Sequence, residues 1–370
     1  MNRFRFTGRH DLIIAGLLSV VIGLAVAVVS SPTSLSALTR PSAAAVSTAT
    51  PSPSPTPAPS PTPSPLTLGR LGNGASLLAV GSVLFAIDQV SMRSSADGGA
   101  TWSDIKLPAG GAGLAVDSAN ASVMVTGGAK IQVSLDGGIT WKATRSTPPG
   151  AGPFTPAMVS AADSNVWLVY GNGNLMRTRD AGISWRIITG LPAVTAPHLA
   201  AMAPPGLFAM ALGDRVFELV DNGTSVKQLP ALPAGGNITE LAVVSSGDPP
   251  DLVAVTDTGH TDRLHAGTWQ DVAGGLAGPL AGLPNGRVWL GDGGQRLGTP
   301  GSLSISFDGG LNWTPATGLP VDQSVDAIAA VGPAGDLVWV YCAAGDLYHS
   351  TDGGRTWTVA SKALRSAPGA

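Results

Sequence analysis

Cysteine is almost absent from this sequence, since Cys342 is the single cysteine among 370 residues. One thiol cannot form an intrachain disulfide, and it cannot supply a cysteine-based metal site. Cys342 follows the apolar run from Leu337 to Tyr341. We therefore expect a buried, unreactive thiol rather than a nucleophile.

Charged residues are also scarce, at 12% of the chain, and basic residues are the minority. Four of the 21 basic residues and one of the 24 acidic residues precede residue 66, which leaves 17 basic and 23 acidic residues after it. Nucleic-acid binding needs a basic surface. We therefore expect no nucleic-acid partner.

Cofactor and metal motifs are missing as well. The sequence has no glycine-rich phosphate loop ending in Lys-Ser/Thr, no His-Glu-x-x-His and no EF-hand spacing. No two of its five histidines are spaced as a metal-ligand pair; they are His10, His198, His260, His265 and His349. We expect neither a cofactor nor a metal ion.

Long apolar runs are missing except for one near the N-terminus. Leu12 to Val29 gives 18 residues without a charge, about the minimum for crossing a bilayer. Residues 1–11 before it carry three arginines, which predicts a short cytoplasmic head and an exported remainder. We expect 12–29 to be an uncleaved single-pass anchor in the cell membrane. A cleaved signal peptide is the alternative, and it would make the protein secreted.

Residues 30–65 are composed mainly of Ser, Thr, Ala and Pro, and proline occupies every second position from Pro51 to Pro65. Such a segment cannot build a core, and it favours extended polyproline II. We expect a disordered linker that holds the following domain, 66–370, away from the membrane.

One octet recurs through residues 66–370, with the pattern Ser/Thr-x-Asp-x-Gly-x-Thr/Ser-Trp. Three close copies and two looser ones are present: 95–102, 134–141, 350–357, 306–313 and 178–185. Degenerate copies lie near Asp221, which lacks the tryptophan, and near Trp269, which lacks the aspartate. We call this octet the box. Its residues are Ser95, Asp97, Gly99, Trp102, Ser134, Asp136, Gly138, Trp141, Asp180, Gly182, Trp185, Asp221, Trp269, Ser306, Asp308, Gly310, Trp313, Ser350, Asp352, Gly354 and Trp357.

The spacing of the boxes predicts the fold. Asp97 and Asp136 are 39 residues apart, and Asp136 and Asp180 are 44 residues apart. Asp308 and Asp352 are also 44 residues apart. Each of the seven units contains four short apolar segments, and this period with four strands per unit is typical of a propeller blade. The sequence predicts an all-β, seven-bladed propeller of four-stranded blades. Leu66 to Leu71 could add an outer strand to the last blade.

The box is expected to be a structural turn between the third and fourth strands. Its aspartate can accept backbone hydrogen bonds from residues ahead of it, and its glycines tolerate positive φ. The leading Ser or Thr adds a hydroxyl partner. We expect the tryptophan to pack between neighbouring blades, with its indole N–H on a backbone carbonyl.

The tandem boxes closely resemble the Asp-box, or BNR, repeat of sialidases, xyloglucan-cleaving glycosidases, sortilin-type receptors and photosystem II assembly factors. In size and architecture the chain is most similar to the assembly-factor propellers. The resemblance implies a β-propeller in which the box is a turn remote from any active site, so it implies no activity. We predict a non-catalytic module that recognises a protein or a glycan through one propeller face.

A diverged, sialidase-like glycoside hydrolase is the alternative. Sialidases use an Arg-Ile-Pro motif, three arginines and a Tyr–Glu pair. No Arg-Ile-Pro occurs here, and Glu218 and Glu240 are the only glutamates. Catalysis is therefore disfavoured, and no catalytic residue is assigned.

The turns between second and third strands should lie at the end of the ring opposite the boxes, where we expect the binding rim. These turns would present Asp88, Lys130, Asn172, Asp214, Arg215, Asp257, His260, Asp292, Arg296 and Asp346. Their mixed, slightly acidic character fits contact with a protein better than contact with a polyanion.

Overall fold

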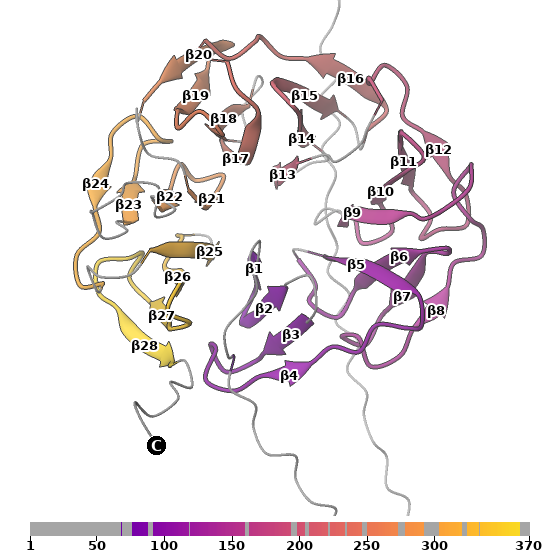
Figure 1. The fold of residues 1–370 in the computed structure, drawn as a ribbon, viewed down its shortest axis with the longest axis horizontal. Helices are drawn as coiled ribbons and strands as arrows, with labels where there is room; N and C mark the ends of the chain where they lie inside the picture. The colour runs from indigo at the N-terminus through magenta and orange to yellow at the C-terminus, as the bar shows by residue number, and fades with distance from the viewer. Residues whose placement is uncertain are drawn as a thin grey trace, which may run out of the picture. The chain divides into compact units, whose positions relative to one another are not determined.

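Seven antiparallel four-stranded sheets surround a central axis in the computed structural model (Figure 1). The structure describes residue 68 and residues 76–87, 92–117, 119–159, 163–193, 198–203, 207–220, 223–233, 235–245, 250–272, 278–291, 303–319, 324–332 and 334–362. The predicted head, anchor and linker (1–65) lie outside these residues. Across the residues that are described, no helix is long and apolar enough to cross a membrane.

Each sheet is one blade, and its strands follow the order of the chain. The first four blades are β1 (Ser76–Val80), β2 (Val83–Ile87), β3 (Met92–Ser95) and β4 (Ser103–Asp104); β5 (Gly111–Val116), β6 (Met124–Gly128), β7 (Gln132–Ser134) and β8 (Lys142–Ala143); β9 (Thr155–Val159), β10 (Trp167–Gly171), β11 (Asn174–Thr178) and β12 (Arg186–Ile187); β13 (His198–Ala203), β14 (Leu207–Leu212), β15 (Arg215–Val220) and β16 (Ser225–Gln228).

The last three blades are β17 (Ile238–Ser245), β18 (Asp251–Thr256), β19 (Thr261–His265) and β20 (Thr268–Asp271); β21 (Leu280–Gly282), β22 (Val288–Gly291), β23 (Leu303–Ser306) and β24 (Thr314–Pro315); β25 (Val325–Val331), β26 (Leu337–Cys342), β27 (Leu347–Ser350) and β28 (Thr358–Ser361). The predicted seven-bladed propeller with four strands per blade is confirmed.

The core lies between blades rather than inside one sheet. The described residues form seven apolar clusters, one at each seam between neighbouring blades. Successive side chains of a strand point to opposite faces, and both faces of a blade meet a neighbour. Central strands therefore read as continuous apolar runs, as in β18, where Leu252, Val253, Ala254 and Val255 are all fully buried.

The ring closes between blades 7 and 1, which lie side by side in Figure 1. Their cluster joins Leu84 and Trp102 of blade 1 to Trp339 and Tyr341 of blade 7. An extra outer strand is expected from Leu66 to Leu71, and of this segment only Leu68 lies among the described residues. Leu68 buries its side chain in the closing cluster, and its carbonyl accepts a hydrogen bond from the Arg93 guanidinium of β3.

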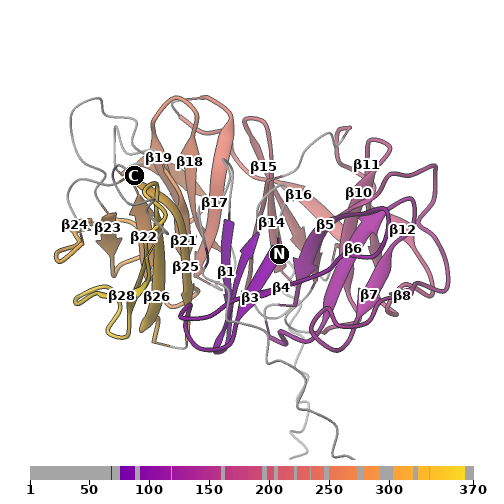
Figure 2. The ribbon, with the colours of Figure 1, turned by 60° about the horizontal axis from the view of Figure 1, so that its bottom comes forward.

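Because neighbouring strands are antiparallel, turns alternate between the two ends of the ring. Figure 2, turned by 60°, shows the strands of each blade running between these two ends. The box turns and the turns between first and second strands share one end, called here the box end. The turns between second and third strands lie at the opposite end.

Candidate binding site

The box turn is held by one hydroxyl and one carboxylate. In the copy at 350–357, the Ser350 hydroxyl donates to Asp352 Oδ1 (2.8 Å) and accepts from the Gly354 N–H (2.7 Å). The carboxylate of Asp352 accepts from the backbone N–H and the hydroxyl of Thr356, at 2.8 and 2.7 Å. The boxes beginning at Ser95, Ser134, Thr178 and Ser306 repeat this pattern.

These hydrogen bonds keep the box carboxylates ionised. The Thr101 hydroxyl and backbone N–H lower the pKa of Asp97 to about 2. Hydrogen bonds from Thr140 lower the pKa of Asp136 to about 2, and those from Ser184 lower the pKa of Asp180 to about 2. All three carboxylates accept hydrogen bonds within their own turns, as expected for a structural role of the box.

The degenerate box of blade 5 differs from the regular boxes. In blade 5 the box is replaced by a two-residue turn, Ala266-Gly267, with φ of 49° and 78°. Positive φ at both central residues is the geometry that joins two twisted strands most tightly. Trp269 still donates to the Pro230 carbonyl (2.9 Å) of the preceding blade. In blade 4, Asp221 lies outside the described residues.

The box also joins neighbouring blades through a backbone carbonyl. In two boxes, the glycine after the aspartate accepts a hydrogen bond from a second-strand tryptophan of the preceding blade: Gly98 from Trp339 Nε1 (2.9 Å) and Gly353 from Trp289 Nε1 (3.2 Å). Blade 5 has no second-strand tryptophan, and Arg263 Nε donates to Gly309 (2.8 Å) in its place.

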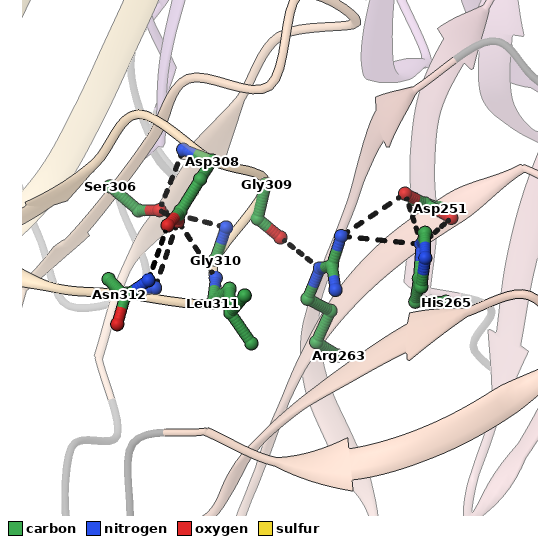
Figure 3. Close-up of polar contacts among 9 residues, drawn as sticks. All are labelled: Asp251, Arg263, His265, Ser306, Asp308, Gly309, Gly310, Leu311 and Asn312. Atoms are coloured by element: carbon green, nitrogen blue, oxygen red, sulfur yellow. Dashed lines mark hydrogen bonds and ion pairs between the residues drawn. The ribbon is translucent and has the colours of Figure 1, made fainter.

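Figure 3 shows how Arg263 is placed for that role. It extends from β19 toward Gly309 of the next blade, and its Nη2 lies 3.3 Å from Asp251 Oδ2. The imidazole Nδ1 of His265 lies 2.9 Å from the same oxygen. Because the guanidinium is mostly buried, the Asp251 carboxylate offsets the cost of removing its charge from water.

The predicted rim residues lie in the turns between second and third strands, and most are exposed. Several are already engaged with neighbours: Asp214 with Arg215 (3.8 Å), Asp257 with Asn237 (2.8 Å) and His260 with Asp271 (2.8 Å). Lys130 and Asn172 are also exposed. Asp88, Asp292 and Arg296 lie outside the described residues.

The predicted rim position of Asp346 is wrong, because this residue is only 3% exposed and cannot present its carboxylate at the rim. Its carbonyl closes the turn by accepting from the Cys342 N–H (2.9 Å), so the residue already belongs to the blade. The exposed position of this turn is Ala344.

The structure also shows a cleft at the seam of blades 3 and 4, called here the arginine cleft. It encloses about 340 Å³ and is lined by Arg177, Arg179, Ser184, Arg186 and Thr224. These residues come from β11, the box of blade 3, β12 and the turn between β15 and β16. Arg177 is held by a hydrogen bond from its Nη1 to the Thr224 hydroxyl (2.9 Å).

The register makes this cleft unusual. Arg177 of β11 lies directly opposite Arg186 of β12, and like charges in that position destabilise a sheet. The equivalent pairs in blades 1, 2, 6 and 7 are Ser94–Ser103, Val133–Lys142, Ile305–Thr314 and His349–Thr358. Among the described residues, neither Arg179 nor Arg186 forms an ion pair.

Three guanidinium groups around one cleft can bind an anion through paired N–H donors, the geometry that suits a carboxylate or a phosphate. Aliphatic side chains lie beside these residues in the sequence. Ile183 is 53% exposed and Ile187 is 43% exposed. Neither isoleucine is among the residues that line the cleft.

The glutamates are placed separately. Glu218 is buried on β15, 3.5 Å from Lys227 Nζ. Glu240 is partly buried on β17, the innermost strand of blade 5, and burial raises the pKa of its carboxyl to about 7. Within the described ranges, no group of three or more His, Cys, Asp and Glu side chains could hold a metal ion.

The repeat itself identifies the architecture. The BNR/Asp-box repeat model matches residues 132–143 and 348–359. The chain is a seven-bladed propeller that contains Asp-box repeats. No curated protein sequence matches this Asp-box propeller.

Solved structures share its fold. YCF48 bound to D1 peptide is similar at a TM-score of 0.55 and 17% identity, over 76% of this chain and 95% of that one. The GH74 enzyme of Niastella koreensis gives 0.57 and 13% identity, over 80% of this chain and 55% of that one. PorZ of Porphyromonas gingivalis gives 0.52 and 13%, over 81% and 39%. A peptide-bound protein, an enzyme and a secretion-system component thus share this propeller fold, and at these identities the likeness is one of fold alone.

Proposed function

We propose that the chain is a non-catalytic binding and assembly module, which holds an acidic segment of a protein partner in the arginine cleft. The observation that carries this proposal is the cleft itself, where Arg177 and Arg186 face each other across β11 and β12 and Arg179 lines the same space. A repulsive pair weakens the sheet, whereas a bound carboxylate between the two guanidiniums would remove the repulsion.

A protein partner fits the surroundings of the cleft. Arginine is enriched at interfaces between proteins, and the exposed Ile183, next to Ser184 of the lining in the sequence, could add an apolar contact. The bound D1 peptide in the YCF48 structure supports a peptide or protein as the kind of partner. We further propose that the module is exported and anchored in the membrane through residues 12–29.

The proposal is tested by peptide binding. A fluorescein-labelled peptide rich in Asp and Glu should bind the propeller, and its Asn/Gln counterpart should not. Because each charge-assisted contact contributes about 1.5–3 kcal/mol, R179Q and R186Q should each weaken binding roughly 10-fold or more, measured by fluorescence anisotropy.

The matched controls lie at the opposite end of the ring. K130Q and R215Q remove one positive charge each from the predicted rim, so they should leave binding unchanged. If these two variants lose binding while R179Q and R186Q keep it, the binding site is the rim and the cleft proposal is wrong.

A glycoside hydrolase is the second candidate, and Glu240 is the residue that favours it. A carboxyl with a pKa near 7 can serve as a general acid at neutral pH. Hydrolysis of chromogenic glycosides above background, lost in E240Q, would establish this function. We expect no such hydrolysis.

A further inference from the structure

The charged residues of the propeller are unevenly distributed around the ring. Residues 105–197, which lie between β4 and β13 and form blades 2 and 3, carry seven basic and four acidic residues, a net charge of +3. The rest of 66–370 carries ten basic and nineteen acidic residues, a net charge of −9. The four acidic residues of blades 2 and 3 are Asp117, Asp136, Asp163 and Asp180, and Asp117 is fully buried. These two blades, which are neighbours in Figure 1, therefore form the positively charged part of the ring.

The segment that follows β8 contacts the box of blade 3 at the edge of the arginine cleft. The Ser146 hydroxyl donates to the Ile183 carbonyl (2.7 Å), and Trp185 Nε1 donates to the Ser146 carbonyl (3.2 Å). Ile183 directly precedes Ser184, which lines the cleft. Arg145 directly precedes Ser146, so this segment places Arg145 next to the box of blade 3.

The fold does not require an arginine at position 145. The outer strand of blade 2 ends where the Thr144 N–H donates to the Ile131 carbonyl (3.0 Å) at the start of the third strand. Ile105, Ile188, Leu229 and Ala316 form the same backbone hydrogen bond in blades 1, 3, 4 and 6. The residues that follow these positions are Lys106, Thr189, Pro230 and Thr317. Residues as different as Thr and Pro occupy the position, so the backbone contact does not account for Arg145.

Lys142 and Arg145 carry charges that are available to a partner. Both residues are exposed, and neither forms an ion pair within the described ranges. Lys142 lies opposite Val133 in β8, the position that Arg186 of the cleft occupies in β12. The carboxylate of Asp136, in the box of the same blade, accepts hydrogen bonds from Thr140 within its own turn. Blade 2 thus extends the basic character of the cleft.

Ile183 lies between the two sets of basic residues. Its side chain is 53% exposed, although it does not line the cleft. On one side it adjoins Ser184 of the cleft, and on the other its carbonyl accepts from Ser146, the neighbour of Arg145. Basic, apolar and basic residues therefore follow one another from the cleft to blade 2.

We propose that the partner held in the arginine cleft continues over Ile183 to Arg145 and Lys142, called here the blade 2 subsite. This inference rests on the proposed function, and it specifies the partner. The partner is a protein segment with two acidic groups on either side of an apolar residue. Its first acidic group occupies the cleft, the apolar residue covers Ile183, and the second acidic group binds Arg145 and Lys142 through charge-assisted hydrogen bonds.

The charge distribution favours this orientation of the partner. An acidic segment is attracted to blades 2 and 3 and repelled by the rest of the ring, where acidic residues outnumber basic ones. Opposite charges of this kind guide a partner to one region and suppress binding elsewhere. The segment should therefore leave the cleft toward blade 2 and not across blade 4.

Two labelled peptides test the subsite. The short peptide carries one cluster of Glu residues, and the long peptide adds a Leu and a second Glu cluster through Gly spacers, whose length is varied to find the tightest binder. Fluorescence anisotropy should show that the long peptide binds about 10-fold more tightly than the short one. K142Q/R145Q should remove this gain and leave the short peptide unaffected, and I183S should weaken the long peptide alone.

K106Q/K130Q is the matched control, because it also removes two positive charges from residues 105–197 but at positions outside the subsite. It should keep the gain of the long peptide. Thermal unfolding verifies that every variant is folded.

The outcomes separate the subsite from the cleft. The subsite is overturned if the short peptide binds and the long one binds no more tightly, or if K106Q/K130Q lowers the gain as much as K142Q/R145Q does. If the long peptide alone binds, and K142Q/R145Q abolishes that binding, the subsite is supported and the cleft proposal is wrong. If neither peptide binds, both proposals are wrong.

Discussion

At the scale of the residue, the two adjacent glycines of a box meet different demands. Gly137 and Gly138 have φ of 74° and 88°, so both adopt the left-handed conformation. A Cβ on Gly137 would meet nothing within 4 Å, whereas a Cβ on Gly138 would lie 2.8 Å from Ile105 Cγ2. The first glycine is needed for backbone conformation alone, and the second is also needed for packing.

We therefore predict that G138A destabilises the propeller more than G137A does. Both substitutions carry the backbone strain of positive φ, about 1–3 kcal/mol. Overpacking at 138 should add about 1–3 kcal/mol to the loss in the free energy of unfolding. Urea denaturation of the two variants measures the difference, and equal midpoints would contradict the packing argument.

At the scale of the element, blade 5 contains a carboxyl group that is buried without a hydrogen-bond partner among the described residues. Asp262 of β19 is fully buried, and neither of its carboxylate oxygens has a hydrogen-bond partner among the described residues. It lies directly opposite Asp271 of β20, whose carboxylate is 2.8 Å from His260 Nδ1. Burial raises the pKa of Asp262, Asp271 raises it further, and His260 lowers it in part.

This placement predicts a pH dependence of stability. A carboxyl whose pKa is higher in the folded state than in the unfolded state favours folding below the unfolded value of 3.8. That contribution is lost as the pH rises through the folded value. D262N carries no charge at any pH, so it should unfold at a higher temperature than the wild type at neutral pH, and the gain should disappear near pH 4. Parallel melting curves across this range would show that Asp262 does not titrate as inferred.

The strands and blades could be predicted from the sequence because every unit repeats the same apolar segments at one period. The arginine cleft could not, because it depends on the register that places Arg177 against Arg186. The flanks of the blade 3 box contain the signal, since both arginines lie one residue outside it. The sequence places Asp346 at the rim, because it does not show where the turn ends and the buried strand begins.

The contact of Arg263 with Gly309 was equally hidden. Arg263 lies on the third strand of blade 5, yet it makes the contact that a second-strand tryptophan makes in other blades. No sequence pattern indicates this replacement. The predicted rim and the predicted anchor remain predictions, as do the partners assigned to them.

At the scale of the whole molecule, the ring closes with the same contact that joins interior blades. Trp339 Nε1 donates to Gly98 at the seam of blades 7 and 1, and Trp289 Nε1 donates to Gly353 at the seam of blades 6 and 7. Both tryptophans are almost completely buried. The closing seam should therefore be about as strong as an interior one.

W339F and W289F test this equivalence. Each removes one buried N–H donor and part of a ring, which should cost about 1–3 kcal/mol in the free energy of unfolding. We expect the two losses to agree within about 1 kcal/mol and unfolding by guanidinium chloride to remain a single transition. A much larger loss for W339F, or a separate early transition, would mean that the closing seam is a weak point.

The backbone carbonyl of the glycine after the box aspartate has a consequence for connectivity. The hydrogen-bond acceptor is a backbone carbonyl. The same contact occurs at the seam of blades 6 and 7, where the polypeptide is continuous, and at the seam of blades 7 and 1, where it is not. Neighbouring blades are thus held together by noncovalent contacts, whether or not the chain connects them directly. Circular permutation, with new ends opened between blades 6 and 7 and a linker across blades 7 and 1, should give the same ring.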